Sequence, residues 1–149
     1  MSFKINFKSE HLRHQKYIEY EISSLQDYYE LITDFITDKN ISYENNDDIE
    51  FMDYLLYKGP ISDIYISYLE FLLSQKIHAS IIANYMNFQY RSYAPRIVNF
   101  IYLLLAEYEL SIVNNIIDNM DSNIKTELCL KGYHFCKQIP CLKQYLVFS

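Results

Sequence analysis

The apolar residues of this sequence recur in a fixed pattern, in which an apolar pair is followed, after two intervening positions, by a second apolar pair. Positions i, i+1, i+4 and i+5 lie on one side of an α-helix. The first positions of four such quartets, 51, 81, 112 and 141, are 30, 31 and 29 residues apart. Each quartet follows another apolar segment, and these segments are 25–37, 65–74, 97–106 and 124–132. A helix-turn-helix unit repeated about every 30 residues is typical of an α-solenoid.

The same pattern also has a simpler source. Half of the residues are hydrophobic, so quartets at these spacings arise in any amphipathic helix. The pairs Tyr68-Leu69 and Leu72-Leu73 fit the pattern but fall outside the 30-residue phase. The sequence therefore predicts a mainly α-helical chain of helix-turn-helix units, arranged either as a solenoid or as a compact helical bundle.

The first 22 residues show a different period. Apolar and polar residues alternate in segments 3–8 and 17–22, as in β-strands with one buried face. Antiparallel pairing would place the apolar residues on one face, and Lys4 and Lys8 opposite Glu19 and Glu21 on the other, which is a favourable cross-strand arrangement. We therefore predict a short β-hairpin at the N-terminus.

Helical signals continue through the rest of the chain. Ser24 is the expected N-cap of the first helix, with Asp27 three residues later. Pro95 and Pro140 stand where first helical positions are expected. The expected helices are 25–37, 47–58, 62–76, 78–88, 95–108, 110–120, 124–134 and 139–147.

No stretch has the composition of a linker between domains. We therefore predict a single domain, 1–149, in which a hairpin cap (1–22) precedes the helical repeats (23–149). The chain is long enough to bury a sizeable core.

Charge is distributed unevenly along the chain. Residues 1–74 carry 6 Lys and Arg against 14 Asp and Glu, and residues 75–149 carry 7 against 5. An acidic half disfavours contact with nucleic-acid phosphates, which requires clustered basic residues, and suits a basic protein partner. We expect no nucleic-acid partner.

The sequence also bears on the expected compartment. The most apolar window, 97–117, is interrupted by Asn99, Glu107 and Glu109, so we expect no membrane insertion. The N-terminus lacks an apolar run of signal-peptide length. Three cysteines, an odd number, favour reduced thiols. The expected location is the cytoplasm, or the host cytoplasm if the chain is viral.

The stretch NNDDIEFMDYLLYKGP, residues 45–60, gathers four acidic residues. Asp47 and Asp48 are expected to cap a helix that buries Phe51 and its apolar neighbours, and the helix dipole stabilises acidic residues in the first turn. No catalytic role is needed for these acids. Asp48 and Asp53 are instead candidates for contact with a basic partner.

Tyrosine is abundant, with 16 residues, and it is enriched at the energetic centres of protein interfaces. Segment 87–95 (NFQYRSYAP) is predicted to be an exposed loop between helices. The candidate partner-binding aromatic and basic residues are Tyr54, Tyr57, Tyr90, Arg91 and Tyr93.

The chemical motifs that the sequence offers are weak. Cys129, His134, Cys136 and Cys141 have the residue types of a zinc site, but their spacing matches no common zinc motif. A nucleophile built from His134 and Cys136 would lack an orienting acid and an oxyanion donor. Two separated glycines exclude a glycine-rich phosphate loop. We predict no catalytic residues, no metal and no cofactor.

Three segments resemble one family. DIEFMDYLLYKGPIS, LSIVNNIIDNMDSNIKTE and KGYHFCKQIPCLKQYLV resemble the second helix and following loop of ankyrin repeats in the degenerate form found in large DNA viruses and protists. The resemblance covers about residues 25–149 and includes Gly59 and Gly132, while the Thr-Pro-Leu-His opening of that family is missing. It implies a non-enzymatic protein that binds other proteins through a concave face and exposed turns.

A second family is also similar. SSLQDYYELITDFI, FMDYLLYKGPISDIYISYLEFLL and RIVNFIYLLLAEY follow the helix order of poxviral Bcl-2-like proteins. That resemblance implies inhibition of innate immune signalling or apoptosis. The Trp-Gly-Arg signature of the apoptotic subset is missing.

These observations lead to one functional expectation and two alternatives. The expected function is a non-catalytic intracellular interaction module that sequesters or scaffolds a cellular or host protein. The alternatives are a Bcl-2-like inhibitor and an acidic inhibitor or immunity protein that covers a basic enzyme site. Homodimerisation stays open.

Overall fold

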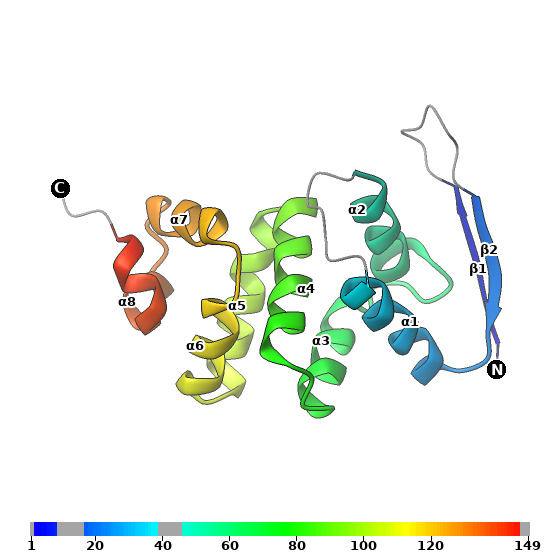
Figure 1. Cartoon of the computed structure of the whole chain (residues 1–149), viewed down its shortest axis with the longest axis horizontal. Helices are drawn as coiled ribbons and strands as arrows, with labels where there is room; N and C mark the ends of the chain where they lie inside the picture. Colours follow the sequence, from blue (N-terminus) through cyan, green and yellow to red (C-terminus); the bar gives the residue numbers. More distant parts are fainter. Residues whose placement is uncertain (1, 9–16, 39–45, 147–149) are drawn as a thin grey trace. The chain divides into compact units, whose positions relative to one another are not determined.

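The computed structural model describes residues 2–8, 17–38 and 46–146. These residues are mainly helical, with a two-stranded antiparallel sheet near the N-terminus (Figure 1). The predicted helical class with an N-terminal hairpin is thus confirmed. The chain divides into two compact units, Met1–Ile77 and His78–Ser149. The single domain and the repeat architecture stay predictions.

The first unit contains the sheet and the helices that follow it. Its elements are β1 (Phe3–Lys8), β2 (Tyr17–Ile22), α1 (Leu25–Asp38), α2 (Asn46–Asp53), the π-helix η1 (Tyr54–Lys58) and α3 (Tyr65–Ser74).

The predicted alternation of faces in the hairpin is confirmed. Phe3, Ile5 and Phe7 of β1 lie opposite Ile22, Tyr20 and Ile18 of β2. Lys4 lies opposite Glu21 as predicted, but the prediction for Lys8 was wrong, because the register places Tyr17 opposite it and Asn6 opposite Glu19. Lys4 forms its ion pair diagonally, with Glu19, at 3.3 Å. Both side chains are exposed, so this pair contributes little stability. The apolar face packs inward, where the Phe7 ring lies 5.0 Å from that of Phe51 and 5.4 Å from that of Tyr54.

Helix α1 buries one apolar side. Tyr28, Ile32 and Ile36 are buried and Phe35 is half-buried, whereas Leu25, the first residue of the helix, is 42 % exposed. The Ser24 hydroxyl accepts a hydrogen bond from the Asp27 backbone N–H at 3.1 Å, which confirms the predicted N-cap.

Helix α2 begins at Asn46 and continues into η1, where the backbone turns become wider. The Gly59 N–H closes this segment by donating to the Tyr54 carbonyl at 2.6 Å. A Cβ at position 59 would lie 3.0 Å from both the Tyr28 hydroxyl and the Tyr54 carbonyl oxygen. That hydroxyl donates to the Leu55 carbonyl at 2.6 Å. Glycine is therefore favoured here by the close approach of Tyr28 from α1 and of the Tyr54 carbonyl.

The second unit consists of helices alone in its described part. Its elements are α4 (Ala79–Ser92), α5 (Pro95–Glu107), α6 (Leu110–Asp118), α7 (Ser122–Leu130), α8 (Phe135–Gln138) and the 3₁₀ helix η2 (Pro140–Tyr145). Helix α4 packs against α5 and α6, and η2 packs against α6, α7 and α8. The apolar quartets at 81, 112 and 141 thus lie on helices that contact one another in succession.

Polar side chains tie successive helices of this unit together. Asn87 Oδ1 of α4 accepts from the Asp121 N–H at 3.2 Å, and Asn114 Oδ1 of α6 accepts from the Cys141 N–H at 2.8 Å. The paired residues are 34 and 27 positions apart. These separations are close to the 30-residue spacing of the apolar quartets.

A buried lysine joins three elements at the C-terminal end of α6. Lys125 of α7 is 5 % exposed, and its ammonium group donates to the Asp118 carbonyl at 2.9 Å. The same group lies 5.2 Å from the centre of the Tyr145 ring in η2. A cation at the carbonyl end of a helix is stabilised by the helix dipole, and the ring face adds a further attraction.

Several helix ends differ from the sequence prediction. Helix α4 runs to Ser92 and not to 88, and α7 ends at Leu130 and not at 134. The early end of α7 has a local cause, since Gly132 adopts a positive φ of 73°, which terminates the helix. The predicted helix 139–147 is a 3₁₀ helix over Pro140–Tyr145, and residue 147 of the predicted range lies outside the described residues. The short helix α8, before it, was not predicted. None of the described helices combines the length and apolar character needed to span a bilayer.

Candidate binding site

Segment 87–95, predicted as an exposed loop, is mostly helical. Asn87 and Gln89 are buried, at 1 % and 2 % exposure, and both are hydrogen-bonded, Gln89 to the Tyr85 hydroxyl at 3.0 Å. Because these polar side chains find partners in the core, α4 continues past them. The prediction was wrong at this point since it took polar residues as the end of the helix.

This extension places the candidate residues differently from the prediction. Tyr90 is 9 % exposed and lies within α4, together with Arg91. Tyr93 follows the helix and is 57 % exposed. The Arg96 guanidinium lies over its ring at 5.4 Å from the centroid.

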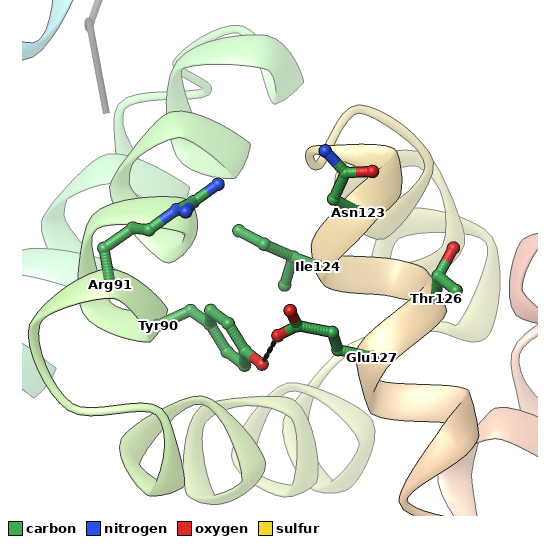
Figure 2. Close-up of a pocket in the computed structure, with 6 residues that line it drawn as sticks. All are labelled: Tyr90, Arg91, Asn123, Ile124, Thr126 and Glu127. Atoms are coloured by element: carbon green, nitrogen blue, oxygen red, sulfur yellow. Dashed lines mark hydrogen bonds between the residues drawn. The ribbon is translucent and has the colours of Figure 1, made fainter. Parts of the chain in front are cut away.

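A pocket of about 330 Å³ lies between the C-terminal end of α4 and α7 (Figure 2). Two of the predicted residues line it, and four others come from α7. The lining residues are Tyr90, Arg91, Asn123, Ile124, Thr126 and Glu127. The buried side chain of Ile124 supplies the apolar part, and the remaining side chains are polar or amphipathic.

One side-chain hydrogen bond joins α4 to α7 at the pocket. The Tyr90 hydroxyl donates to Oε2 of Glu127, and the second carboxylate oxygen is turned away from Tyr90 toward Ile124 (Figure 2). Burial, the hydrogen bond and the charge of Glu127 raise the pKa of Tyr90 to about 12. The hydroxyl therefore stays protonated at neutral pH and acts as a fixed donor to Glu127.

A second contact holds the opposite side of the pocket. Arg91 Nη2 lies 3.5 Å from Oδ2 of Asp121. Oδ1 of the same carboxylate caps α7 by accepting from the Asn123 N–H at 2.8 Å. The Arg91 charge is thus balanced next to the pocket, and the first turn of α7 is fixed against α4.

The outer side of the Tyr90 ring carries a further charge. The Lys131 ammonium group lies 5.7 Å from the ring centroid, in cation–π range. Tyr90 is therefore held through both its ring and its hydroxyl, and the pocket wall that it forms is well ordered by contacts within the chain.

The acidic candidates of the first unit are less accessible than predicted. Asp48 lies in the first turn of α2, not before it, and is 7 % exposed. Asp53 is half-buried at the end of that helix. Glu44, the acidic residue just before the stretch 45–60, lies outside the described residues. The structure therefore presents no exposed acidic array along residues 46–53.

The aromatic candidates of the first unit have contacts within the chain. The Tyr54 hydroxyl accepts from the Asn6 N–H at 2.9 Å and so joins η1 to β1. Tyr57 stacks on Tyr65 with ring centroids 4.8 Å apart. The structure does not bring these residues together with Tyr90, Arg91 and Tyr93 within one compact unit, because they belong to the first unit.

The three cysteines pack in the C-terminal part of the second unit. Cys129 and Cys136 are buried, and Cys141 is half-buried. Burial raises the pKa of Cys136 to about 12, with a further contribution from the neighbouring Cys129 thiol, and raises that of Cys141 to about 11. Within residues 2–8, 17–38 and 46–146, no three His, Cys, Asp or Glu side chains are grouped as metal ligands.

Four lining residues were not identified from the sequence. Asn123, Thr126 and Glu127 lie at the i, i+3 and i+4 positions of one helix, so they share a face. The sequence shows this spacing, but it does not show which helix packs against the face that the three residues share. Only the extension of α4 to Ser92 shows that this face meets Tyr90.

Comparison of the chain with models of protein families, with curated proteins and with solved structures gives no significant match. The resemblances to ankyrin-repeat and Bcl-2-like proteins therefore stay predictions.

Proposed function

We propose that the chain is a non-catalytic protein-binding module and that the pocket between α4 and α7 receives a side chain of the partner. The observation that carries the proposal is the pocket itself, which has an apolar floor at Ile124 and polar walls held in place by the Tyr90–Glu127 and Arg91–Asp121 contacts. Pre-ordered polar groups around an apolar floor are suited to recognition.

The chemistry of the pocket favours recognition over catalysis. The protonated Tyr90 hydroxyl is engaged by Glu127, so it is a poor general base at neutral pH. The lining residues include no histidine, cysteine or serine, and their one carboxylate, that of Glu127, is already hydrogen-bonded to Tyr90.

The surroundings of the pocket support a protein as the partner. Tyr93 is exposed just beyond the end of α4, and exposed tyrosine is favoured at protein interfaces. The succession of contacts from α4 to α6 to η2 is the kind of neighbour-to-neighbour packing on which helical-repeat binding proteins rely.

Selection of peptides from a random display library tests this function. Wild-type chain is compared with Asn123→Arg, which adds a long side chain at the exposed rim of the pocket and leaves the core untouched. Asn115→Arg, on the exposed side of α6, is the matched control. We expect enriched peptides to bind wild type and Asn115→Arg equally, and to bind Asn123→Arg at least about tenfold more weakly.

Two results contradict the proposed function. One is the failure of any peptide family to be enriched on wild-type chain. The other is binding that Asn123→Arg leaves unchanged while circular dichroism shows all three chains equally folded.

A further inference from the structure

We infer that the pocket takes a basic side chain of the partner, arginine foremost. The inference rests on the proposed function and names the chemical class of the group that the pocket binds. It follows from a comparison of two sets of groups in the pocket: those already hydrogen-bonded within the chain, and those still available to a ligand.

Both hydroxyl donors of the pocket are committed to partners within the chain. The Tyr90 hydroxyl donates to Glu127, and the Thr126 hydroxyl donates to the Ser122 carbonyl at 2.8 Å. The charge of the Arg91 guanidinium is paired with Asp121. The donors that the lining keeps are the amide of Asn123 and further N–H groups of Arg91.

The acceptors of the pocket have capacity left. Glu127 uses Oε2 for Tyr90, and its second oxygen is turned toward Ile124 (Figure 2). A carboxylate oxygen accepts more than one hydrogen bond, and hydroxyl groups that donate can still accept. The oxygens of Tyr90, Thr126 and Asn123 therefore add to those of Glu127, and the ligand that satisfies them must be a donor.

The charge balance of the lining points the same way. Arg91 is neutralised by Asp121 at 3.5 Å, whereas the hydrogen bond from Tyr90 to Glu127 comes from a neutral hydroxyl. Lys131 lies on the ring of Tyr90 and is not among the lining residues. Of the two charged lining residues, Arg91 has an ion pair among the described contacts and Glu127 has none, which favours a cationic ligand.

Arginine fits this arrangement better than lysine for two reasons. Its guanidinium offers five donors in a fixed plane, whereas an ammonium offers three from one point. Its aliphatic stem can lie over the apolar floor at Ile124 while the charged group reaches Glu127. A volume of about 330 Å³ leaves room for such a side chain.

The test uses end-blocked Gly-Arg-Gly and its citrulline counterpart, which keeps the shape of arginine but lacks its charge. Binding is followed by nuclear magnetic resonance through the side-chain amide of Asn123 and the backbone amides of α7. We expect the arginine peptide to shift these signals at millimolar concentration. The citrulline peptide should bind at least about tenfold more weakly, since a hydrogen bond between charged groups is roughly twice as strong as a neutral one.

Two substitutions distinguish a direct role of Glu127 in binding from an effect of the net charge of the chain. Glu127→Gln keeps the size of the side chain and an oxygen for Tyr90, and should weaken arginine-peptide binding at least about tenfold. Glu109→Gln makes the same charge change at an exposed residue before α6 and should leave binding unchanged. Free arginine amide, compared with the peptide, distinguishes a small molecule from a protein side chain, and tighter binding of the free compound would reject a protein partner.

The inference is overturned by equal binding of the citrulline peptide, by preference for Gly-Glu-Gly, by shifts outside the pocket, or by no shift at all. If the display library yields peptides that lack basic residues yet are sensitive to Asn123→Arg, the proposed function stands and this inference fails.

Discussion

The hydrogen bond between Tyr90 and Glu127 is the single-residue contact with the clearest energetic consequence. Tyr90→Phe removes the donor, and water can replace it at the exposed carboxylate of Glu127, so we expect the free energy of unfolding to fall by about 0.5–1.5 kcal/mol. Urea denaturation measures the change. Tyr93→Phe, at a residue that is 57 % exposed, is the control and should change stability by less than about 0.5 kcal/mol. Equal effects of both substitutions would contradict the importance of the bond.

The same tyrosine makes stability depend on alkaline pH. The pKa of Tyr90 rises from 10.0 to about 12 in the folded chain. The protonated form is favoured by folding, so its contribution is complete below about pH 10 and is lost as the pH rises through about 12. Urea midpoints of wild type and Tyr90→Phe should therefore converge over this interval. A difference that stays constant up to pH 12 would show that Tyr90 does not titrate as described.

The raised thiol pKa values predict slow cysteine chemistry. A thiolate is the reactive form, and burial holds Cys136 and Cys141 protonated, with pKa values of about 12 and 11. In single-cysteine chains at mildly alkaline pH, a chromogenic disulfide reagent should label the half-buried Cys141 slowly, and Cys129 and Cys136 only when urea unfolds the chain. Immediate labelling of Cys136 under native conditions would contradict this expectation.

At the scale of elements, the contact from Asn114 to the start of η2 is the most specific link. Asn114→Ala removes the acceptor of the Cys141 N–H, and we expect a loss of about 1–2 kcal/mol. Hydrogen exchange should show that Asn114→Ala, compared with wild type, accelerates exchange of the backbone amides of η2 more than that of the amides of α4. Asn115→Ala, whose side chain is exposed, serves as the control. If both substitutions affect η2 equally, the hydrogen bond does not hold it.

The elements themselves were mostly predictable from the sequence, because apolar periodicity reports which face of a helix is buried. The alternation of faces in the hairpin followed from the same reasoning at period two, but the register did not, since Lys8 lies opposite Tyr17 and not opposite a glutamate. The end of α4 was not predictable, since Asn87 and Gln89 look like surface residues until their partners are known. The π-helical form of η1 was not predictable either, because apolar periodicity indicates a helix without indicating its width.

The candidate site was predictable only in part. Tyr90 and Arg91 were predicted as binding residues from their residue types, but the prediction that they lie in a loop was wrong. Nothing in the sequence around Glu127 indicated a binding role. A side chain's environment depends on which helices meet, and this information lies in packing and not in local sequence. The burial of Asp48 was missed for the same reason.

At the scale of the whole molecule, removal of residues 122–149 tests the repeat architecture. The truncated chain lacks α7, α8 and η2 but keeps the contacts of α4 with α5 and α6. If the units are stabilised by their neighbours, as in a solenoid, we expect a shorter folded protein with cooperative urea unfolding and circular dichroism per residue close to that of the intact chain. Complete loss of helicity would favour the compact bundle.

The division into two compact units was not visible in the sequence. It falls between Ile77 and His78, where neither glycine nor proline is found. The backbone turns there instead at Lys76, which adopts a positive φ of 52°. His78 then caps α4 by accepting from the Ser80 N–H. Composition cannot reveal a boundary of this kind, because its turn is formed by residues that are common in helices.

The bonds that join Tyr28 to Leu55, Asn87 to Asp121 and Asn114 to Cys141 span 27, 34 and 27 residues. Each contact joins residues at most 34 positions apart, so it can form before the whole chain has been synthesised. During synthesis, each helix that bears one of these side chains meets its partner once about one further helical unit has left the ribosome. Apolar faces that would otherwise attract other nascent chains are thus covered in the order in which they are made.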